Sequence, residues 1–174
     1  QFIKKDANAF VLSTVDATGS PSSRVVLLRK VDDTGFSFFT NYNSYKAQSI
    51  VSNHKVSMNF FWSELERQIR IDGVIEKVSE KASDIYFNSR PYESQIGAWA
   101  SDQSSVLSSR QVIEERVRFF KNKFPKKVPR PPHWGGYKIS AILIEFWQGR
   151  ASRLHDRFKY ELVDGSWEIN RLAP

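Results

Sequence analysis

The sequence predicts a mainly β protein with peripheral α-helices, built on an antiparallel sheet. Runs rich in β-branched and aromatic residues fill the first half of the chain and return near its end, which is typical of strands. Short turn signals join several of these runs, and hairpin connections favour antiparallel neighbours. Helical patterns are confined to a few short stretches and one longer segment.

Five strands are expected in the first half, at residues 10–15, 24–31, 36–40, 56–62 and 68–78. Turn sequences at residues 16–19 and 32–35 make short hairpin connections. In the fourth run, one face of a half-buried strand is formed by Val56, Met58, Phe60 and Trp62. Gly73 in the fifth run predicts a bulge or a sharp bend, and bends of this kind close barrels.

Short helices are expected next to these strands. Residues 44–53 have the pattern of a crossover helix, and residues 79–89 begin at Ser79, which is a plausible N-cap. Pro91 can occupy the first turn of another short helix.

The longest helix is expected to begin at Ser108, where Gln111 completes a capping-box pattern. Its apolar stripe, which indicates packing on the core, consists of Ile113, Val117, Phe120 and Phe124. The proline-rich residues 125–132 form an extended connector. The remaining strands, the last two joined by the turn Asp164-Gly165, are expected at residues 137–147, 157–163 and 167–172.

Length and composition favour a single domain over residues 1–174, with 40% hydrophobic residues to form its core. Lys and Arg outnumber Asp and Glu by 26 to 19, which suits anionic partners in general. The absence of cysteine excludes disulfides, thiolate nucleophiles and cysteine zinc sites. No apolar run approaches the roughly 20 residues that span a bilayer, and residues 1–6 lack a signal-peptide pattern. A cytoplasmic protein without membrane contact is therefore expected, with a further segment before Gln1 because the chain does not begin with Met.

The richest group of polar residues lies near the end of the chain. Residues 153–157 contain two arginines, a histidine and an aspartate, close after Trp147. Guanidinium groups pair with phosphate or carboxylate, and imidazole can donate, accept or stack, so this run suits an anionic aromatic ligand. A solvated surface hairpin is the alternative.

A second group consists of Tyr86, Arg90 and Ser94, which are spaced four apart and would lie along one face of a continuous helix that Pro91 can kink. A phenol, a guanidinium and a hydroxyl together suit a phosphate monoester. An ordinary polar surface is the alternative.

A third group is scattered over expected strand ends and loops: Arg24, Arg29, Ser44, Lys46, Gln68, Gln103 and Ser104. Arg24 and Arg29 bracket an apolar run, so at least one of them leaves the core at a strand end, where a cationic pocket can form. The three histidines lack metal-ligand spacing, and no metal site is expected. The chain has no nucleophile motif, phosphate-binding glycine loop or dinucleotide fingerprint, which argues against a hydrolase activity and against a Rossmann fold.

Basic residues also concentrate in the segment 118–130, and they are the best evidence for a nucleic-acid-binding protein. The aromatic residues of this segment are largely part of the helix stripe, so a solvated helix face and connector is the simpler interpretation.

Several sequence motifs occur in one order along almost the whole chain. They are Arg24-Val25-Val26-Leu27-Leu28, Phe38-Phe39-Thr40-Asn41, Leu65-Glu66-Arg67-Gln68, Arg90-Pro91 with Ser94-Gln95-Ile96-Gly97-Ala98, Gln103-Ser104, Trp134-Gly135-Gly136, Glu145-Phe146-Trp147-Gln148-Gly149, Arg153-Leu154-His155-Asp156-Arg157 and Arg171-Leu172-Ala173-Pro174. With these motifs the chain resembles the pyridoxamine 5'-phosphate oxidase family. The resemblance implies an FMN-binding split β-barrel, with residues 134–174 carrying the dimerisation region and an active-site hairpin.

The same resemblance implies the activity. A homodimer would bind FMN in two clefts at the subunit interface and oxidise pyridoxine 5'-phosphate and pyridoxamine 5'-phosphate to pyridoxal 5'-phosphate. Net hydride transfer would run from the substrate C4′ carbon to flavin N5, with molecular oxygen as electron acceptor and hydrogen peroxide as product.

The resemblance also assigns residues. Flavin contacts would be Arg24, Val25, Val26, Leu27, Leu28, Arg29, Phe39, Thr40, Lys46, Gln68, Gln103, Ser104, Trp147 and Arg157. Substrate contacts would be Arg29, Tyr86, Arg90, Ser94, Arg153, Leu154 and His155. Arg153 and His155 would lie against the pyridine ring as the catalytic pair.

The chain departs from the family pattern at two positions, where Arg29 replaces a usual lysine and Tyr45 a usual arginine. Arg29 keeps the charge, whereas Tyr45 removes one that is expected near the FMN phosphate. The family's amino-terminal substrate-contacting segment has no counterpart here. A flavin oxidoreductase of the same fold with another substrate is the nearest alternative function, and a basic nucleic-acid-binding barrel is the distant one.

Overall fold

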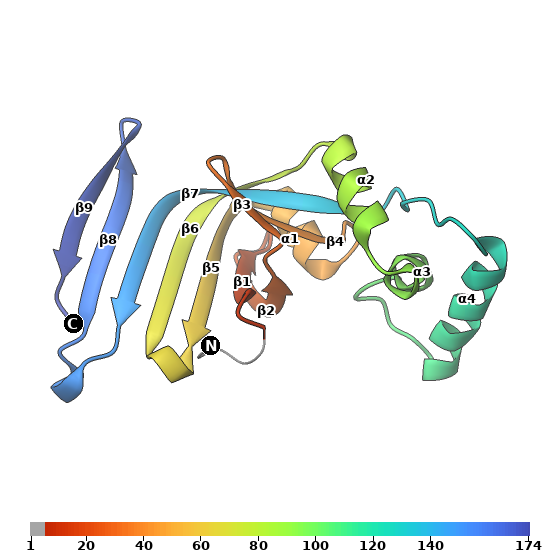
Figure 1. Cartoon of the computed structure of the whole chain (residues 1–174), viewed down its shortest axis with the longest axis horizontal. Coiled ribbons are helices and arrows are strands. Elements are labelled where there is room, and N and C mark those ends of the chain that lie inside the picture. Colours follow the sequence, from red (N-terminus) through yellow and green to blue (C-terminus); the bar gives the residue numbers. More distant parts are fainter. Residues whose placement is uncertain (1–5) are drawn as a thin grey trace. The chain divides into compact units, whose positions relative to one another are not determined.

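The computed structural model describes residues 6–174, which form two compact units (Figure 1). The described part of unit 1 consists of residues 6–38, 49–76 and 138–174, and unit 2 consists of residues 39–48 and 77–137. The single domain expected over residues 1–174 remains a prediction. Residues 1–5, for which the sequence predicts no signal peptide, lie outside the described part.

The strands are β1 (Ala9–Val15), β2 (Pro21–Leu27), β3 (Lys30–Asp32), β4 (Gly35–Asn41), β5 (Lys55–Trp62), β6 (Arg67–Lys77), β7 (Trp134–Gln148), β8 (Asp156–Val163) and β9 (Ser166–Leu172). They form one sheet in the order β2-β1-β5-β6-β7-β4-β3, to which β8 is added beside β7 and β9 beside β8. The pairs β1–β2, β1–β5, β3–β4, β5–β6, β7–β8 and β8–β9 are antiparallel. The mainly β, antiparallel class expected from the sequence is confirmed.

The helices are α1 (Tyr45–Ser52), α2 (Glu80–Ser89), α3 (Tyr92–Ala100) and α4 (Arg110–Lys123), and two short 3₁₀ turns are η1 (Ser63–Leu65) and η2 (Ala151–Arg153). Ser79 caps α2 as expected, because its side chain accepts a hydrogen bond from the Ala82 N–H. Among residues 6–174, no helix combines the length and the apolar character needed to cross a bilayer.

The strand expected at residues 24–31 is wrong as a single element. The backbone N–H of Leu28 donates to the carbonyl of Asn8 at 2.8 Å, whereas that of Arg29 donates to the carbonyl of Ser37 at 2.9 Å. Asn8 directly precedes β1 and Ser37 lies in β4, so the chain changes its pairing partner between two consecutive residues. Two strands therefore replace the expected one.

Gly73 does not form the expected bulge. Pairing of β5 with β6 runs without interruption from Lys55 opposite Val74 to Trp62 opposite Arg67. A side chain at Gly73 would instead lie 2.4 Å from the carbonyl oxygen of Ser140. Glycine is needed here because another backbone passes close by, as the sequence pattern also allows.

The expected capping box of the longest helix is also wrong. The N-cap of α4 is Ser109 rather than Ser108, and its side chain makes no capping hydrogen bond. The apolar stripe of this helix is largely confirmed, because Val117, Phe120 and Phe124 pack against the core of unit 2.

Each unit has its own core. In unit 1, the fully buried side chains come from alternating strand positions, where one face of the sheet excludes water: Phe10, Leu12, Phe38, Met58, Ile71, Ile75 and Ile139. In unit 2, α2, α3 and the connector enclose Phe87, Ile96, Ala98, Val128 and Trp134. Packing of this kind contributes roughly 1.5–3 kcal/mol per buried large apolar side chain.

Candidate active site

A buried lysine is the centre of the first polar group in unit 2. The Lys46 ammonium donates to Thr40 Oγ1 at 3.2 Å, Ser44 Oγ at 3.3 Å and Gln103 Oε1 at 3.4 Å. Lys46 is only 8% exposed, because this second residue of α1 turns its side chain toward Thr40 near the end of β4. We call Thr40, Ser44, Lys46 and Gln103 the Lys46 cluster. Ser104 lies beside it, since its hydroxyl accepts the backbone N–H of Tyr45 at 3.2 Å.

A stack of aromatic rings forms the second group in unit 2. The rings of Phe39 and Tyr86 are stacked with centroids 3.9 Å apart, and the Trp134 ring continues the stack 5.7 Å from Phe39. The Arg90 guanidinium lies over Trp134, 4.5 Å from the ring centre. This cation–π contact holds the Arg90 guanidinium against the Trp134 end of the stack.

Tyr86, Arg90 and Ser94 do not lie on one continuous helix. Helix α2 ends at Ser89 and α3 begins at Tyr92, with Arg90 as the C-cap of the first and Pro91 as the N-cap of the second. The break follows from Pro91, which disfavours helical backbone in the residue before it. The Gln95 side chain bridges the break by donating to the carbonyl of Arg90 at 3.0 Å.

Unit 1 contains a cavity of about 440 Å³ that is lined in part by two predicted flavin contacts, Gln68 and Trp147. These residues come from β6 and β7, at the end of the sheet where η1 joins β5 to β6. Gly149 follows β7, and its N–H donates to the carbonyl of Glu66 at 2.7 Å. A side chain at Gly149 would lie within 2.7 Å of the Glu66 side chain, so glycine allows the chain after β7 to pass close to Glu66.

The predicted catalytic pair lies in the turn between β7 and β8. His155 has its ring 4.7 Å from that of Trp147, and its Nδ1 accepts the backbone N–H of Arg150 at 3.1 Å. Because Nδ1 accepts, the neutral ring carries its proton on Nε2. Arg153 is exposed, with a left-handed backbone at φ 61°, and Leu154 next to it is also exposed.

Asp156 fixes the base of this turn. Its carboxylate accepts from Arg150 Nε at 2.7 Å and from Arg171 Nη1 at 3.0 Å. These guanidinium groups, Arg150 first, lower the pKa of Asp156 below its usual value. The turn is therefore tied to the last strand of the chain.

Arg157 on β8 lies opposite Trp147 in the register of β7 and β8. Its Nε donates to Glu145 Oε1 at 2.8 Å, and its Nη1 donates to the carbonyl of Ala173 at 2.9 Å. Glu145 also accepts from Arg70 Nη2 at 3.1 Å, and Arg70 in turn pairs with Asp72 at 2.8 Å. We call Asp72, Arg70, Glu145 and Arg157 the Glu145 network.

Arg24 and Arg29 lie in unit 1 but in different environments. The Arg24 side chain turns back on β1 and the start of β2, where it donates to the Leu12 carbonyl at 3.1 Å and to Thr14 Oγ1 at 2.9 Å. Arg29 lies between β2 and β3, and its residue is exposed. The apolar residues between them belong largely to β2, with Val25 exposed on its outer side.

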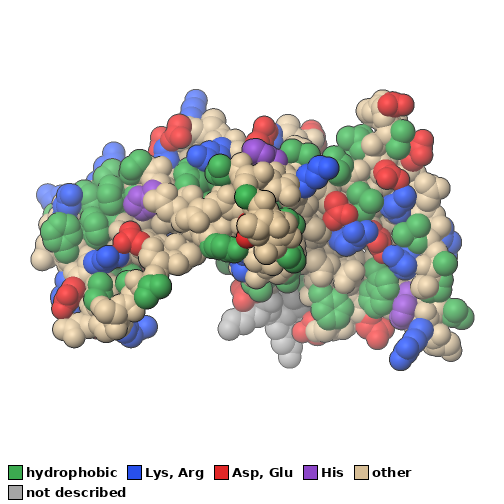
Figure 2. Space-filling model, turned by 180° about the vertical axis from the view of Figure 1, so that it is seen from behind, with side chains coloured by type: hydrophobic (Ala, Val, Ile, Leu, Met, Phe, Trp, Pro, Cys, Tyr) green, Lys and Arg blue, Asp and Glu red, His purple; other side chains and the backbone are tan. Residues whose placement is uncertain are grey.

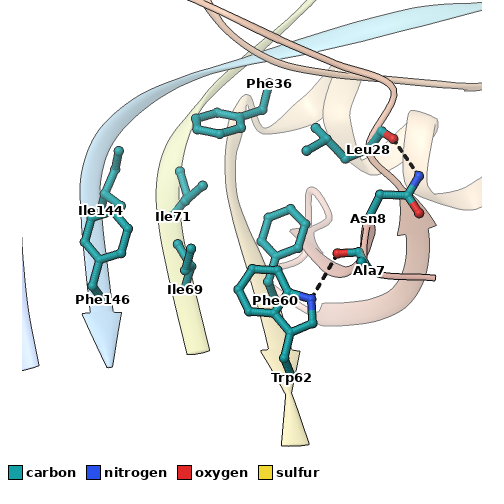
Figure 3. Close-up of a pocket in the computed structure, with 10 residues that line it drawn as sticks. All are labelled: Ala7, Asn8, Leu28, Phe36, Phe60, Trp62, Ile69, Ile71, Ile144 and Phe146. Carbon is teal, nitrogen blue, oxygen red and sulfur yellow. Dashed lines mark hydrogen bonds between the residues drawn. The ribbon is translucent and has the colours of Figure 1, made fainter. Parts of the chain in front are cut away.

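A second cavity in unit 1, of about 380 Å³, is almost entirely apolar (Figure 3). Its lining comes from β4, β5, β6, β7, the residues before β1 and the residue after β2: Ala7, Asn8, Leu28, Phe36, Phe60, Trp62, Ile69, Ile71, Ile144 and Phe146. The Trp62 indole N–H donates to the carbonyl of Ala7 at 3.0 Å, which is one of the two hydrogen bonds drawn there. Ile69 and Ile71 point into this cavity, so Arg70 between them projects from the other face of the sheet.

The predicted residues thus fall into separate groups. Within unit 2 the structure brings together Thr40, Lys46 and Gln103, and it brings together Phe39, Tyr86 and Arg90. In unit 1 it places Trp147 beside His155 and opposite Arg157. Ser94 lies in α3, after the break at Arg90 and Pro91, and Arg29 lies beyond the end of β2, the strand that contains Arg24.

Sequence reasoning missed Glu145, Arg70 and Trp134 as parts of the site. The sequence did contain a signal for Arg70 and Glu145. Arg70 is two residues from Gln68, and Glu145 is two residues from Trp147, so each shares a strand face with a predicted flavin contact. No spacing rule indicates Trp134, which contacts the stack only through the fold of unit 2. Among residues 6–174, no group of His, Cys, Asp and Glu is arranged to hold a metal ion.

Known proteins are similar to this chain along nearly its whole length. The family model described as pyridoxamine 5'-phosphate oxidase matches residues 1–122, and the model of the pyridoxine 5'-phosphate oxidase C-terminal dimerisation region matches residues 134–174. A pyridoxine/pyridoxamine 5'-phosphate oxidase of Cupriavidus metallidurans is 52% identical over 97% of this chain and 80% of its own length. One of Nostoc punctiforme is 53% identical with the same coverage.

A solved structure extends the comparison to the fold. PhzG from Burkholderia lata, in complex with tetrahydrophenazine-1-carboxylic acid, superposes with a TM-score of 0.93 at 29% identity, over 98% of this chain and 84% of that one. The split-barrel class expected from the sequence is thereby confirmed. Two family models that together span nearly the whole chain, and relatives that are half identical to it, lead to one conclusion: this chain belongs to the pyridoxamine 5'-phosphate oxidase family.

Proposed function

We propose that this protein uses FMN to oxidise pyridoxine 5'-phosphate and pyridoxamine 5'-phosphate to pyridoxal 5'-phosphate, with oxygen as the electron acceptor. The observation that carries the proposal is the pair of cationic groups in unit 2, at Lys46 and at Arg90, in a chain of this family. FMN and the substrate each bring one phosphate monoester. Two such ligands need two cationic groups.

The Lys46 cluster fits the FMN phosphate. A buried ammonium among hydroxyl and amide groups offers one positive charge and several hydrogen-bond partners, which is what a phosphate monoester requires. Thr40, Ser44 and Ser104 can rotate their hydroxyls to donate to phosphate oxygens. Gln68, Trp147 and Arg157, which belong to unit 1, would contact the ring system of the cofactor.

The substrate phosphate would bind at Tyr86 and Arg90. The aromatic stack holds both groups before any ligand binds, since Phe39 fixes the phenol ring and Trp134 fixes the guanidinium. A preorganised guanidinium and phenol lose little freedom on binding, so more of their interaction appears as affinity. Ser94 would add a hydroxyl at the start of α3.

FMN, when bound, supplies the redox chemistry, taking a hydride equivalent from C4′ of the substrate and passing two electrons to oxygen to give hydrogen peroxide. The chain contributes orientation. Arg153 would stabilise negative charge on the substrate ring oxygen, and His155 would present its Nε2–H as a donor beside the Trp147 ring. Holding C4′ in a reactive geometry is the larger part of the protein's contribution.

We also propose a homodimer in which a second copy completes each FMN site. The support is the match of residues 134–174 to a dimerisation region, together with the apolar cavity of unit 1. Ile144 and Phe146 belong to both, and Phe146 is 42% exposed. Burial of such residues against a second copy would remove apolar surface from water.

A flavin enzyme of the same fold with a different substrate is the second candidate, favoured by the likeness to PhzG, whose structure contains a carboxylic acid ligand without phosphate. The two candidates differ in the anion that Arg90 would bind, which is a phosphate monoester for the first and a carboxylate for the second. A nucleic-acid-binding barrel has less support, because basic side chains are interspersed with acidic and neutral ones on the face shown in Figure 2.

Aldehyde formation from pyridoxine 5'-phosphate by the purified protein tests the proposal. We expect a yellow protein that produces pyridoxal 5'-phosphate and hydrogen peroxide in equal amounts and is inactive on unphosphorylated pyridoxine. Flavin binding without turnover of either phosphorylated substrate would favour the second candidate. Protein that binds no flavin would exclude both.

A further inference from the structure

A row of four charged side chains crosses three neighbouring strands of unit 1, and the function proposed above uses only the last of them. Figure 1 shows β6, β7 and β8 side by side. The Glu145 network runs from Asp72 and Arg70 on β6 through Glu145 on β7 to Arg157 on β8, with successive contacts of 2.8, 3.1 and 2.8 Å. The charges alternate in sign along the row.

Glu145 is the buried member of this row, with a side chain only 5% exposed. A buried carboxylate is costly unless it is paired, and here each of its oxygens accepts from a different guanidinium. Arg157 first and Arg70 second lower the pKa of Glu145, so the group is ionised at neutral pH. Both contacts together leave this carboxylate a single orientation.

Glu145 also restricts Arg157. The Arg157 Nε donates to Glu145 and its Nη1 donates to the Ala173 carbonyl, whereas Nη2 has no hydrogen-bond partner within residues 6–174. A guanidinium is planar, so fixing two of its nitrogens fixes the direction of the third. The Arg157 side chain remains 31% exposed, and Nη2 is not among the buried side-chain atoms that lack a hydrogen-bond partner, so a ligand can reach it.

We propose that Glu145 is a positioning residue that orients Arg157 Nη2 toward the bound FMN. The inference rests on the proposed function, because it requires FMN to bind at Arg157. Glu145 acts through Arg157 and does not itself contact cofactor or substrate. The competing explanation is that the network only joins β6, β7 and β8, in which case its loss would lower stability without a specific effect on the flavin.

The test uses the full chain stripped of flavin and titrated with FMN, with binding followed by the quenching of flavin fluorescence. Glu145→Gln keeps the size of the side chain, but one of its terminal atoms becomes a donor and can no longer accept from a guanidinium. We expect FMN to bind about tenfold more weakly, as for partial loss of one charge-assisted hydrogen bond. The matched control is Glu161→Gln on β8, whose carboxylate pairs with Lys159 at 2.6 Å, and it should bind FMN like the wild type.

A double-mutant cycle separates positioning from a general weakening of the sheet. Arg157→Met removes the group through which Glu145 is proposed to act. Added to Arg157→Met, the change Glu145→Gln should then alter FMN affinity by less than about twofold, because the two effects share one contact. Melting temperatures of all four proteins report the structural contribution separately.

The outcomes are distinguishable. Wild-type protein that does not bind FMN would overturn the proposed function. Wild-type protein that binds FMN, with Glu145→Gln lowering only the melting temperature, would overturn the positioning role and leave the proposed function intact. If Glu145→Gln weakens FMN binding equally in the wild type and in Arg157→Met, the positioning role is also overturned. Should Glu145→Gln fail to fold, Arg70→Met takes its place, with an expected loss of about threefold for freeing one Glu145 oxygen, and unchanged affinity would again overturn the role.

Discussion

At the scale of single residues, the site consists of side chains whose orientation is set by a neighbour. Arg90 is held by the Trp134 ring, His155 by the Arg150 N–H, and Arg157 by Glu145. In the last two cases one nitrogen has no hydrogen-bond partner within residues 6–174, namely Nε2 of His155 and Nη2 of Arg157. Substitutions of these residues should therefore affect ligand binding more than folding.

Arg153→Ala should lower kcat/KM for pyridoxine 5'-phosphate by roughly 10²-fold or more, the magnitude typical of losing a preorganised electrostatic contact. The residue is exposed and contributes little to packing. The measurement is turnover per bound flavin, with His155→Ala as a milder companion. Normal turnover per flavin in Arg153→Ala would contradict the catalytic assignment, and a shared fall in melting temperature and flavin content would mean that the turn is only structural.

Arg90→Ala should raise KM for the phosphorylated substrate by roughly 10- to 100-fold, corresponding to the loss of one charge-assisted contact of about 1.5–3 kcal/mol. Flavin content should remain nearly normal, because Arg90 belongs to the aromatic stack and not to the Lys46 cluster. Lys46→Ala is the complementary variant and should lose flavin. The opposite pattern in the two variants would reverse the assignment of the two phosphates.

At the scale of elements, most strands and helices could be predicted because their patterns are local. The alternation of Val56, Met58 and Phe60 needs only a half-buried strand, and Asp164-Gly165 needs only a turn in which both residues have positive φ. The predictions of strands were wrong where the structure depends on pairing with segments that are distant in the sequence. The division between Leu28 and Arg29 depends on two different pairing partners, which no local pattern contains.

Gly73→Ala tests the close approach of backbones in unit 1. The new methyl group would lie 2.4 Å from the Ser140 carbonyl oxygen, which cannot move as a flexible side chain would. We expect a loss of about 1–3 kcal/mol in the free energy of unfolding, as for other overpacked positions.

Gly97→Ala in α3 is the matched control, because a methyl group there meets nothing within 4 Å. It should stabilise the protein by roughly 0.5–1 kcal/mol through helix propensity. Thermal unfolding followed by circular dichroism compares the two variants. Equal stability of Gly73→Ala and the wild type would show that the strands can separate at this point without cost.

At the scale of the whole molecule, the family could be identified from motifs that span the chain, whereas the grouping of their residues could not. The sequence places Gln68 far from Trp147 and Arg157, and only the pairing of β6 with β7 brings its strand beside theirs. For the same reason the Glu145 network was missed. Charged pairs between strands depend on register, which the sequence alone does not define.

The purified protein should contain FMN and not FAD, and it should sediment as a homodimer. The Lys46 cluster offers one cationic centre for one phosphate, and the chain has no dinucleotide fingerprint. Release of the flavin by heat followed by chromatography identifies it, and sedimentation gives the mass. A monomer that retains a full complement of tightly bound flavin would count strongly against a site shared between subunits.

Stability should fall in acid because of Glu145. Its pKa is lowered in the folded protein from an unfolded value near 4.5, so its contribution is complete above that pH and is lost as the pH falls through the folded value. The difference in melting temperature between the wild type and Glu145→Gln should therefore shrink as the pH is lowered below about 4.5. A difference that stays constant down to strongly acid pH would mean that the charge of Glu145 contributes nothing to folding.

The two faces of β6 constrain how this family can change over evolutionary time. Ile69 and Ile71 point into the apolar cavity, while Gln68, Arg70 and Asp72 point the other way. Insertion of a single residue would exchange the faces, placing a guanidinium among the aromatic rings and an isoleucine beside Glu145. Gains and losses of residues among relatives should therefore be confined to the hairpin turns, and the length of this strand should be inherited unchanged even where its side chains differ.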